Sequence, residues 1–388
     1  MQLPVLDNAA AREVAGNRSI HLLTEEAFIR QHRPGGRLYT NSENAIGWIT
    51  ERLGDNELAR GIRRFKDKHL FRRELAGLYP EFIFREVRPE DLGRVDPETL
   101  VFPLILKPSV GFFSRGVYRV NNRRDWTRAL EQIGRRVPEP DGSYPREVLD
   151  DSRYLMEAYI EGQEYAVDAY FDDRGEPVIL NILHHAFSTD EDVSDRVYTT
   201  GARVMEEAME GCVRLLGQMN TLWGLRNFPL HMEVRIDGNQ LVPIEINPMR
   251  FAGWCTTDLA WHAYGINVYE HFFAQRRPDW PAILEATGDR LYSIVVLDRP
   301  AERTAKDPGQ LDVERLLTRF DHPLEFRPVD AGTYGVYGFL FTETRENNRA
   351  ELDWILRADL REFLKTVAGI VWDGPTGCDR NGKREIPR

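Results

Sequence analysis

Two glutamates and an asparagine lie on a predicted β-hairpin in a pattern that could bind a divalent cation. The segment reads HMEVRIDGNQLVPIEINP, and side chains alternate between the two faces of a strand. A three-residue loop over Gly238-Asn239-Gln240 places Glu233 directly opposite Glu245. Like charges repel at such positions, and a cation bound by Glu233, Glu245 and Asn247 removes the conflict. The alternative is a solvated polar face on a surface hairpin.

The chemistry and the alternation of this hairpin lead to two further expectations. Two carboxylates and an amide oxygen form an all-oxygen ligand set, which suits Mg²⁺ or Mn²⁺ and not zinc. His231, Glu233 and Arg235 share one face of the first strand. The apolar face of the second strand is expected to carry Val242, Ile244 and Ile246.

Two lysines stand where phosphate could bind. Lys107 ends an apolar strand expected over residues 100–107, and a loop with Gly111, Ser114 and Gly116 follows it. Backbone N–H groups of such a loop can hold phosphate oxygens, while a lysine supplies a point charge. Lys68 lies in a charged run beside a helix expected over 66–78. Taken alone, each lysine fits a solvated surface position better.

A strand expected over 153–160 contains Glu157 and runs into Glu-Gly. Such a strand end can present backbone groups to a planar base. Glu164 begins the next expected strand, 164–171.

The order of these pieces resembles the ATP-grasp superfamily, which includes biotin carboxylase, D-alanine–D-alanine ligase and the amino-acid ligases. Lys68 comes first, followed by Lys107 with its loop, MEAYIEGQE, and the hairpin that ends in EINP. The resemblance covers about residues 60–275, and the ordered set is far more specific than any one member. A glutamate lies twelve residues before the glutamate of EIN.

The resemblance implies a role for each position. Lys68 and Lys107 would contact the phosphates of ATP, and the loop with Gly111, Ser114 and Gly116 would close over them. Glu157 would accept a hydrogen bond from the adenine amino group. The backbone of Ala158 and Ile160 would frame the adenine edge, and Glu164 would bind the ribose hydroxyls. The magnesium ions would be bound by Glu233, Glu245 and Asn247.

The sequence departs from the family pattern in two places. Many relatives carry an arginine two residues after the metal-binding asparagine, whereas here Met249 fills that position and Arg250 follows it. Arg250 is our candidate, with Lys107, for catalysis, because a guanidinium can contact an acyl phosphate or a substrate carboxylate. Phe112 and Phe113 occupy a loop that is richer in glycine in relatives.

Several polar and aromatic residues could line an acceptor pocket. They lie between the expected ribose strand and the hairpin, or just after the hairpin: His184, His185, Arg196, Tyr198, Arg203, Trp254, Cys255 and His262. The alternative is a surface connection with one histidine packed inward, and a small buried Cys255.

The elements that must position these residues indicate an α+β chain rather than alternating βαβ units. Helices are expected over 43–53, 66–78, 123–136, 203–219, 256–275 and 351–368, and a strand over 38–41. We predict a reduced N-terminal region over 1–65 and an ATP-grasp core over 66–275. The core consists of a subdomain with the lysines and the phosphate loop, 66–155, and a subdomain that binds adenine and metal, 156–275. A C-terminal unit and a tail follow over 290–370 and 372–388, and the unit would cover the site or form a homodimer interface.

Composition sets the limits for these expectations. The chain has 388 residues with 62 acidic and 51 basic side chains, so its net charge of −11 gives no general attraction to nucleic acid or anionic lipid. No apolar run approaches the ~18–20 residues that span a bilayer. Three widely spaced cysteines indicate neither a disulfide framework nor a zinc site. A cytoplasmic protein with no membrane partner is expected.

The leading prediction is an ATP-dependent, ADP-forming ligase that joins a small carboxylic acid to an amine through an acyl phosphate. Another ATP-grasp activity (carboxylase, acyl-CoA ligase or phosphotransferase) is the alternative, although the chain has no biotinyl-lysine motif such as AMKM. A non-catalytic ATP-binding regulatory protein is a further alternative. Phosphoryl transfer requires positioning and charge neutralisation, so the lack of a GxSxG motif does not count against an enzyme.

Overall fold

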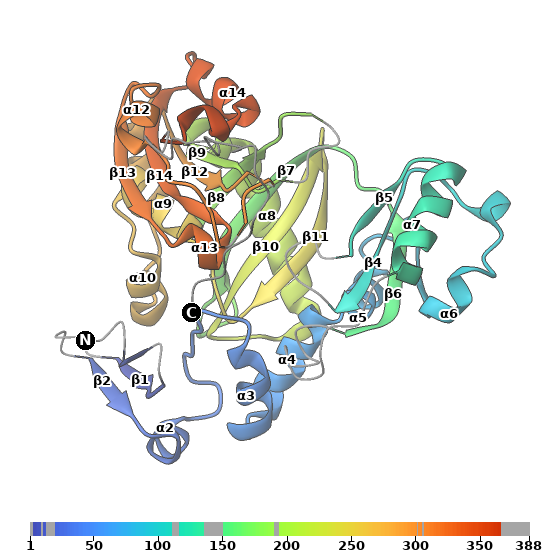
Figure 1. Ribbon diagram of the computed structural model, residues 1–388. Coiled ribbons are helices and arrows are strands. Elements are labelled where there is room, and N and C mark those ends of the chain that lie inside the picture. Colours follow the sequence, from blue (N-terminus) through green and yellow to red (C-terminus); the bar gives the residue numbers. More distant parts are fainter. Residues whose placement is uncertain are drawn as a thin grey trace, which may run out of the picture.

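The structure is a computed structural model that describes residues 3–8, 11–12, 20–110, 116–135, 150–189, 194–300, 302–304 and 306–365. Its strands form sheets of two, four and eight strands, and helices pack against them (Figure 1). This arrangement confirms the predicted α+β class.

The largest sheet has the strand order β11-β10-β7-β8-β9-β12-β14-β13, and neighbouring strands are antiparallel. Its strands are β7 (Gln163–Phe171), β8 (Pro177–Ala186), β9 (Val197–Gly201), β10 (Phe228–Asp237), β11 (Gln240–Pro248), β12 (Arg290–Asp298), β13 (Pro323–Pro328) and β14 (Val336–Arg345). The C-terminal strands therefore extend the sheet that carries the hairpin, because β12 pairs with β9.

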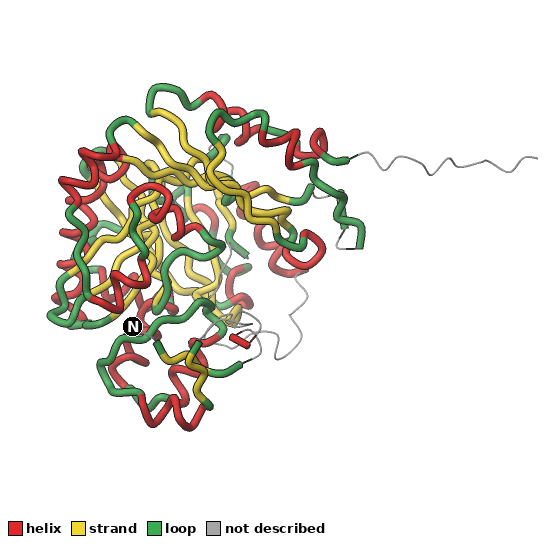
Figure 2. Tube along the Cα trace, turned by 90° about the vertical axis from the view of Figure 1, so that its left-hand side faces the viewer, coloured by secondary structure: helices red, strands yellow, loops and turns green. Residues whose placement is uncertain are grey.

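Helix α8 (Ala202–Trp223) packs against one face of this sheet. Alternate residues of β7, such as Val167 and Phe171, share a buried cluster with Met205 and Leu216 of the helix. On the other face, Tyr170 packs with residues of α9 (Leu259–Tyr264) and α10 (Val268–Ala274). Figure 2 shows the helices lying outside the strands.

The single helix expected over 256–275 is wrong. A 3₁₀ turn (Thr256–Asp258) leads into α9, which ends at Gly265, and α10 begins after Asn267. Gly265 has a φ of 67°, a left-handed conformation that ends the helix.

The four-stranded sheet forms the separate group of strands at the right of Figure 1. Its order is β3 (Phe84–Val87), β6 (Asp150–Ala158), β4 (Leu104–Val110) and β5 (Tyr118–Val120). Trp126 and Ala129 of α7 (Arg123–Arg135) pack on it, and α6 (Pro89–Leu92) with the 3₁₀ turn η1 (Pro97–Thr99) joins β3 to β4.

The N-terminal part pairs β1 (Pro4–Leu6) with β2 (His21–Leu23) and continues through α2 (Glu25–Gln31), α3 (Ala45–Arg52), α4 (Asn56–Lys66) and α5 (Lys68–Leu75). Residues 38–41 form no strand, so that prediction is wrong, although Thr40 N–H donates to the Met249 carbonyl at 2.8 Å. The helix expected over 66–78 begins at Lys68, because Asp67 caps α5 by accepting from Leu70 N–H at 3.0 Å.

The C-terminal helices are α11 (Trp280–Thr287), α12 (Val313–Leu317), α13 (Ala331–Tyr334), α14 (Ala350–Arg357) and the 3₁₀ turn η3 (Leu360–Phe363). The helix expected over 351–368 is therefore too long, and the predicted tail lies outside the described residues. The boundaries between units stay a prediction. Within the described ranges, no helix has the length and apolar character that crossing a membrane requires.

Candidate active site

One face of the adjacent strands β7 and β10 carries the polar residues of the candidate site. Across the two strands, Arg235 is paired with Glu164 and His231 with Asp168. Both pairs interact: Arg235 Nη2 lies 3.0 Å from Glu164 Oε2, and His231 Nδ1 lies 2.8 Å from Asp168 Oδ1. Glu233 lies between His231 and Arg235 on the same face, as the alternation predicted.

The pairing of Glu233 with Glu245 across β10 and β11 is confirmed, and His231 pairs with Asn247. The predicted three-residue loop is wrong, because Asp237 pairs with Gln240 around a two-residue turn.

A β-bulge at Ile244 supplies the extra residue that brings the two glutamates into register. It also breaks the alternation of β11, so Leu241 and Ile246 pack against the main core. The prediction that Val242 and Ile244 share the face of Ile246 is wrong.

Arg72 of α5 holds this bulge. Its Nη1 donates to the Pro243 carbonyl at 2.5 Å and its Nη2 to the Ile244 carbonyl at 3.2 Å, while its Nε donates to Glu157 Oε2 at 2.5 Å. The guanidinium is buried and lies 4.6 Å from the ring centroid of Phe82. Sequence reasoning missed Arg72, although its position four residues after Lys68 places both on one helix face.

Both predicted phosphate-binding lysines are buried and paired, so the solvated alternative is wrong for each. Lys68 Nζ lies 2.9 Å from Glu245 Oε2, and Lys107 Nζ lies 2.7 Å from Glu157 Oε1. Burial opposes ionisation of Glu245, but the adjacent Lys68 and Lys107 lower its pKa to about 2. The two lysines thus approach the hairpin from α5 and from the four-stranded sheet.

Glu157 is 3% exposed and binds both Arg72 and Lys107. Despite burial, these two cations lower the pKa of Glu157 to about 2. Its carboxylate is therefore committed to ion pairs, whereas the predicted role needs it to accept from an adenine amino group. Ala158 N–H donates to the Ile83 carbonyl at 2.9 Å, and the Ile160 carbonyl accepts from Arg235 at 3.1 Å. The adenine roles stay predictions.

Glu233 has the opposite electrostatic surroundings to Glu245. Burial and the negative charges of Glu245 and Glu164 raise the pKa of Glu233 well above its usual value. A cation at the hairpin would relieve this repulsion, so Glu233, Glu245 and Asn247 fit a divalent ion chemically. Among the described residues, the ligand atoms of His231, Glu233 and Glu245 do not all lie within 4.8 Å of one another.

A tighter group of ligand-type side chains occurs elsewhere. Ligand atoms of Asp67, His69 and Glu86 lie within 4.8 Å of one another. Arg153 already donates to Asp67 at 3.0 Å and to Glu86 at 2.9 Å, so both carboxylates have a cationic partner without a metal.

Arg250 lies beside the hairpin and is held by the N-terminal part of the chain. Its Nη2 lies 2.6 Å from Glu43 Oε1, and Lys66 forms an ion pair with the same carboxylate. Burial raises the pKa of Glu43, but Lys66 and Arg250 lower it more. Glu43 had no local sequence signal, because its contact with Arg250 joins residues 207 positions apart. Lys66 joins this group only through its ion pair with Glu43.

Of the acceptor candidates, His185 and Tyr198 lie next to the polar face. His185 Nδ1 lies 3.0 Å from Glu164 Oε1, and its ring stacks on Tyr198 with 4.2 Å between centroids. Arg196 instead donates to backbone carbonyls of Ile355 and Ala358.

The other candidates are also engaged with neighbouring side chains. Arg203 pairs with Glu207 on the surface of α8, and His184 lies 3.0 Å from Gln163 Oε1. His262 Nε2 lies 3.1 Å from Glu325 Oε2, and Cys255 interacts electrostatically with Arg327. Trp254 packs against Tyr334 and Phe339.

Residues 100–258 match the family model of the ATP-grasp domain. The chain carries an ATP-grasp domain. The matched range contains Lys107, Glu157 and the whole carboxylate hairpin, whereas Lys68 precedes it. The predicted superfamily is confirmed. No curated protein matches the sequence significantly.

Solved structures of low sequence identity share the ATP-grasp fold. L-amino acid ligase from Bacillus licheniformis is 18% identical, with a TM-score of 0.57, and the match covers 91% of this chain and 82% of that one. N5-carboxyaminoimidazole ribonucleotide synthetase from Thermotoga maritima is 17% identical, with a TM-score of 0.58 and coverage of 94% and 92%. The biotin carboxylase domain dimer of 2-oxoglutarate carboxylase from Hydrogenobacter thermophilus, a complex with MgADP, ADP and bicarbonate, is 13% identical, with a TM-score of 0.54 and coverage of 89% and 81%.

The loop of this ATP-grasp domain that is expected to close over phosphate can be followed only at its end. Gly111 and Ser114 lie outside the described residues. Gly116 has a φ of 74°, a left-handed conformation that suits the turn into β5.

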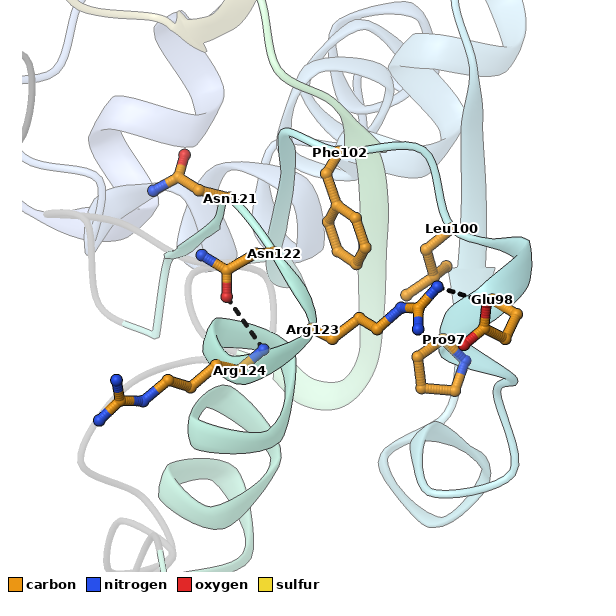
Figure 3. A pocket seen from close by; sticks show the side chains of 8 residues that line it. All are labelled: Pro97, Glu98, Leu100, Phe102, Asn121, Asn122, Arg123 and Arg124. Carbon is orange, nitrogen blue, oxygen red and sulfur yellow. Dashed lines mark hydrogen bonds and ion pairs between the residues drawn. The ribbon is translucent and has the colours of Figure 1, made fainter.

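A surface cavity of about 410 Å³ lies between η1 and the start of α7 (Figure 3). Arg123 pairs with Glu98 there, and Asn122 Oδ1 accepts from Arg124 N–H at 2.9 Å. Of the predicted site residues that the structure describes, none lines this cavity.

Proposed function

We propose that this protein is an ATP-dependent ligase that activates a small carboxylic acid as an acyl phosphate and joins it to an amine, forming ADP. The observation that carries the proposal is the meeting of the opposed Glu233 and Glu245 with Lys68 and Lys107, next to Arg250. Such a cluster neutralises transferred phosphoryl charge without a covalent enzyme intermediate.

The acidic and the basic residues of the site bind different parts of the Mg-ATP complex. Glu233, Glu245 and Asn247 would hold Mg²⁺ or Mn²⁺, which neutralises ATP phosphate charge when bound. Lys68 and Lys107 bind phosphate oxygens. Arg250 then exchanges its contact with Glu43 for the acyl phosphate or the substrate carboxylate.

Two displacements make up the reaction. A carboxylate oxygen attacks the γ-phosphorus and ADP leaves. The amine then attacks the carbonyl carbon, phosphate leaves with the C–O bonding electrons, and the amine loses a proton.

Two structural neighbours support the choice of chemistry. The neighbour from Bacillus licheniformis is an L-amino acid ligase, and the one from Hydrogenobacter thermophilus binds MgADP as a dimer. A homodimer and a cytoplasmic location belong to this proposal. Because that second neighbour also binds bicarbonate, ATP-dependent carboxylation is the second candidate function.

The test is a screen of carboxylic acids with Mg-ATP and hydroxylamine. We expect one class of acid to give ADP, phosphate and a hydroxamate, and Glu245→Gln to remove this activity. Glu210→Gln, a change on the surface of α8, is the matched control and should stay active. Acid-dependent release of AMP and pyrophosphate would exclude the acyl-phosphate mechanism. ADP release that requires bicarbonate alone would favour carboxylation.

A further inference from the structure

His231 lies two residues before Glu233, and its two ring nitrogens have different neighbours. Nδ1 lies 2.8 Å from Asp168 Oδ1, whereas Nε2 lies 3.9 Å from Glu233 Oε1. Asp168 is fully buried, and its Oδ1 also accepts from Ala252 N–H at 2.8 Å. A buried carboxylate on Nδ1 places the ring proton there and leaves a lone pair on Nε2, the ring nitrogen that lies 3.9 Å from Glu233 Oε1.

The contact between Nε2 and Glu233 is not a hydrogen bond. Its length of 3.9 Å exceeds the hydrogen-bond range, which ends at about 3.2 Å. Two electron-pair donors at this separation can bind one metal ion, because bonds of about 2.0–2.2 Å each allow ligand atoms up to about 4.3 Å apart. Asn247, an expected ligand, is paired with His231 across the hairpin.

We propose that His231 Nε2 is a further ligand of the cation that Glu233, Glu245 and Asn247 hold, which makes the site a mixed nitrogen and oxygen site selective for Mn²⁺ over Mg²⁺. The inference rests on the proposed function only in assuming a cation at the hairpin. Imidazole nitrogen favours transition-series ions over Mg²⁺, and a carboxylate behind the imidazole orients such a ligand. Asp168 is then a positioning residue.

The direct test is pulsed electron paramagnetic resonance of Mn²⁺ bound to the full-length protein with ADP. Labelling the protein with ¹⁵N-histidine separates the imidazole signal from the ¹⁴N of adenine. We expect a ¹⁵N coupling in the natural protein that is lost in His231→Gln. The coupling should persist in His262→Gln, the matched control, because that histidine is also paired to a carboxylate but lies on α9.

Titration calorimetry gives the second readout. Mn²⁺ should bind the ADP complex at least about tenfold more tightly than Mg²⁺, and His231→Gln should weaken Mn²⁺ binding by about 10- to 100-fold. Mg²⁺ binding should change much less.

The outcomes distinguish this inference from the proposed function. Bound Mn²⁺ without a ¹⁵N coupling in the natural protein overturns the histidine ligand, while the carboxylate site stands. A coupling that survives in His231→Gln also overturns it, because another histidine would then be the ligand. If neither Mn²⁺ nor Mg²⁺ binds with ADP, the proposed function itself fails. Since the first measurement needs no variant, poor folding of His231→Gln leaves the test intact.

Discussion

Glu233 and Glu245 are identical side chains whose pKa values are shifted in opposite directions by their neighbours. Lys68 and Lys107 hold the pKa of Glu245 at about 2, whereas burial and the charge of Glu245 raise the pKa of Glu233. Glu245 therefore stays ionised at neutral pH without a metal. Ionisation of Glu233 is unfavourable unless a cation is bound beside it. Such a split within one pair of carboxylates is typical of functional sites.

Lys107 should serve both turnover and stability. Lys107→Met removes a phosphate contact, which commonly costs ~2–4 kcal/mol in the transition state and slows turnover roughly 30- to 1000-fold. It also leaves the buried Glu157 with Arg72 alone, so the urea midpoint should fall. Turnover in the hydroxamate assay and urea unfolding check the two effects separately. An unchanged rate with a lower midpoint would assign Lys107 a structural role only.

His184 should make stability depend on pH. Burial lowers the pKa of His184 to about 4, below the value near 6.5 of the unfolded chain. The unfolded state therefore binds the proton more tightly, and the contribution of His184 is complete above pH 6.5 and falls as pH drops toward 4. The slope is at most about 1.4 kcal/mol per pH unit. Urea unfolding at pH 7 and pH 5 should show a smaller difference for His184→Asn, and an equal difference would contradict the shift.

At the scale of elements, the β-bulge at Ile244 decides which way Glu245 points. The two-residue turn at Gly238-Asn239 alone would pair the strands one residue out of step, and the bulge restores the register beyond it. Arg72 binds the carbonyls of Pro243 and Ile244 and so stabilises the bulge from outside the sheet.

Deletion of Ile244 should therefore remove the bulge without turning Glu245 away. Val234 pairs with Pro243, so Glu245 would become the next residue of the strand and would still lie opposite Glu233. We expect cation binding with ADP, measured by calorimetry, to persist, and the urea midpoint to fall because Arg72 loses the Ile244 carbonyl. Deletion of Asp173, in the turn between β7 and β8, is the control that shortens a different antiparallel pair. Loss of cation affinity after deletion of Ile244 would show that the pairing alone does not orient Glu245.

The sequence predicted the site best where contacts are local and worst where they are distant. The opposition of Glu233 and Glu245 follows from alternation within one hairpin, although the bulge and the shorter turn were not visible in the pattern. Arg72 could have been found from its helical spacing to Lys68. Glu43 could not, because only the tertiary fold brings the N-terminal part of the chain to Arg250. Asp168 likewise reads as one polar residue in an apolar strand.

At the scale of the whole molecule, the site depends on how two sheets are held together. The chain passes from β6 of the four-stranded sheet to β7 of the eight-stranded sheet through Gly162. This glycine has a φ of 103°, and a Cβ there would lie 2.3 Å from the Ile236 carbonyl oxygen. Only glycine fits this close approach without moving one sheet relative to the other.

Gly162→Ala should weaken both the fold and nucleotide binding. Strain of this kind commonly costs about 1–3 kcal/mol, and the shift would separate Lys107 from the hairpin. Urea unfolding and calorimetry with MgADP measure the two effects. Gly134→Ala in α7, where a Cβ meets nothing within 4 Å, is the matched control and should be neutral or stabilising by up to about 1 kcal/mol. Equal behaviour of both variants would rule out Gly162 as the connection that fixes the sheets.

The continuity of the eight-stranded sheet limits how the chain can be shortened. The family match ends at residue 258, so a shortened protein could be designed to end just after the hairpin. Strand β9 hydrogen-bonds to both β8 and β12, so removal of the C-terminal strands would leave its backbone groups unpaired along one side. An exposed edge of this kind is a template for intermolecular strand pairing. A fragment ending near residue 275 is therefore expected to aggregate during expression, even though it retains every residue assigned here to ATP.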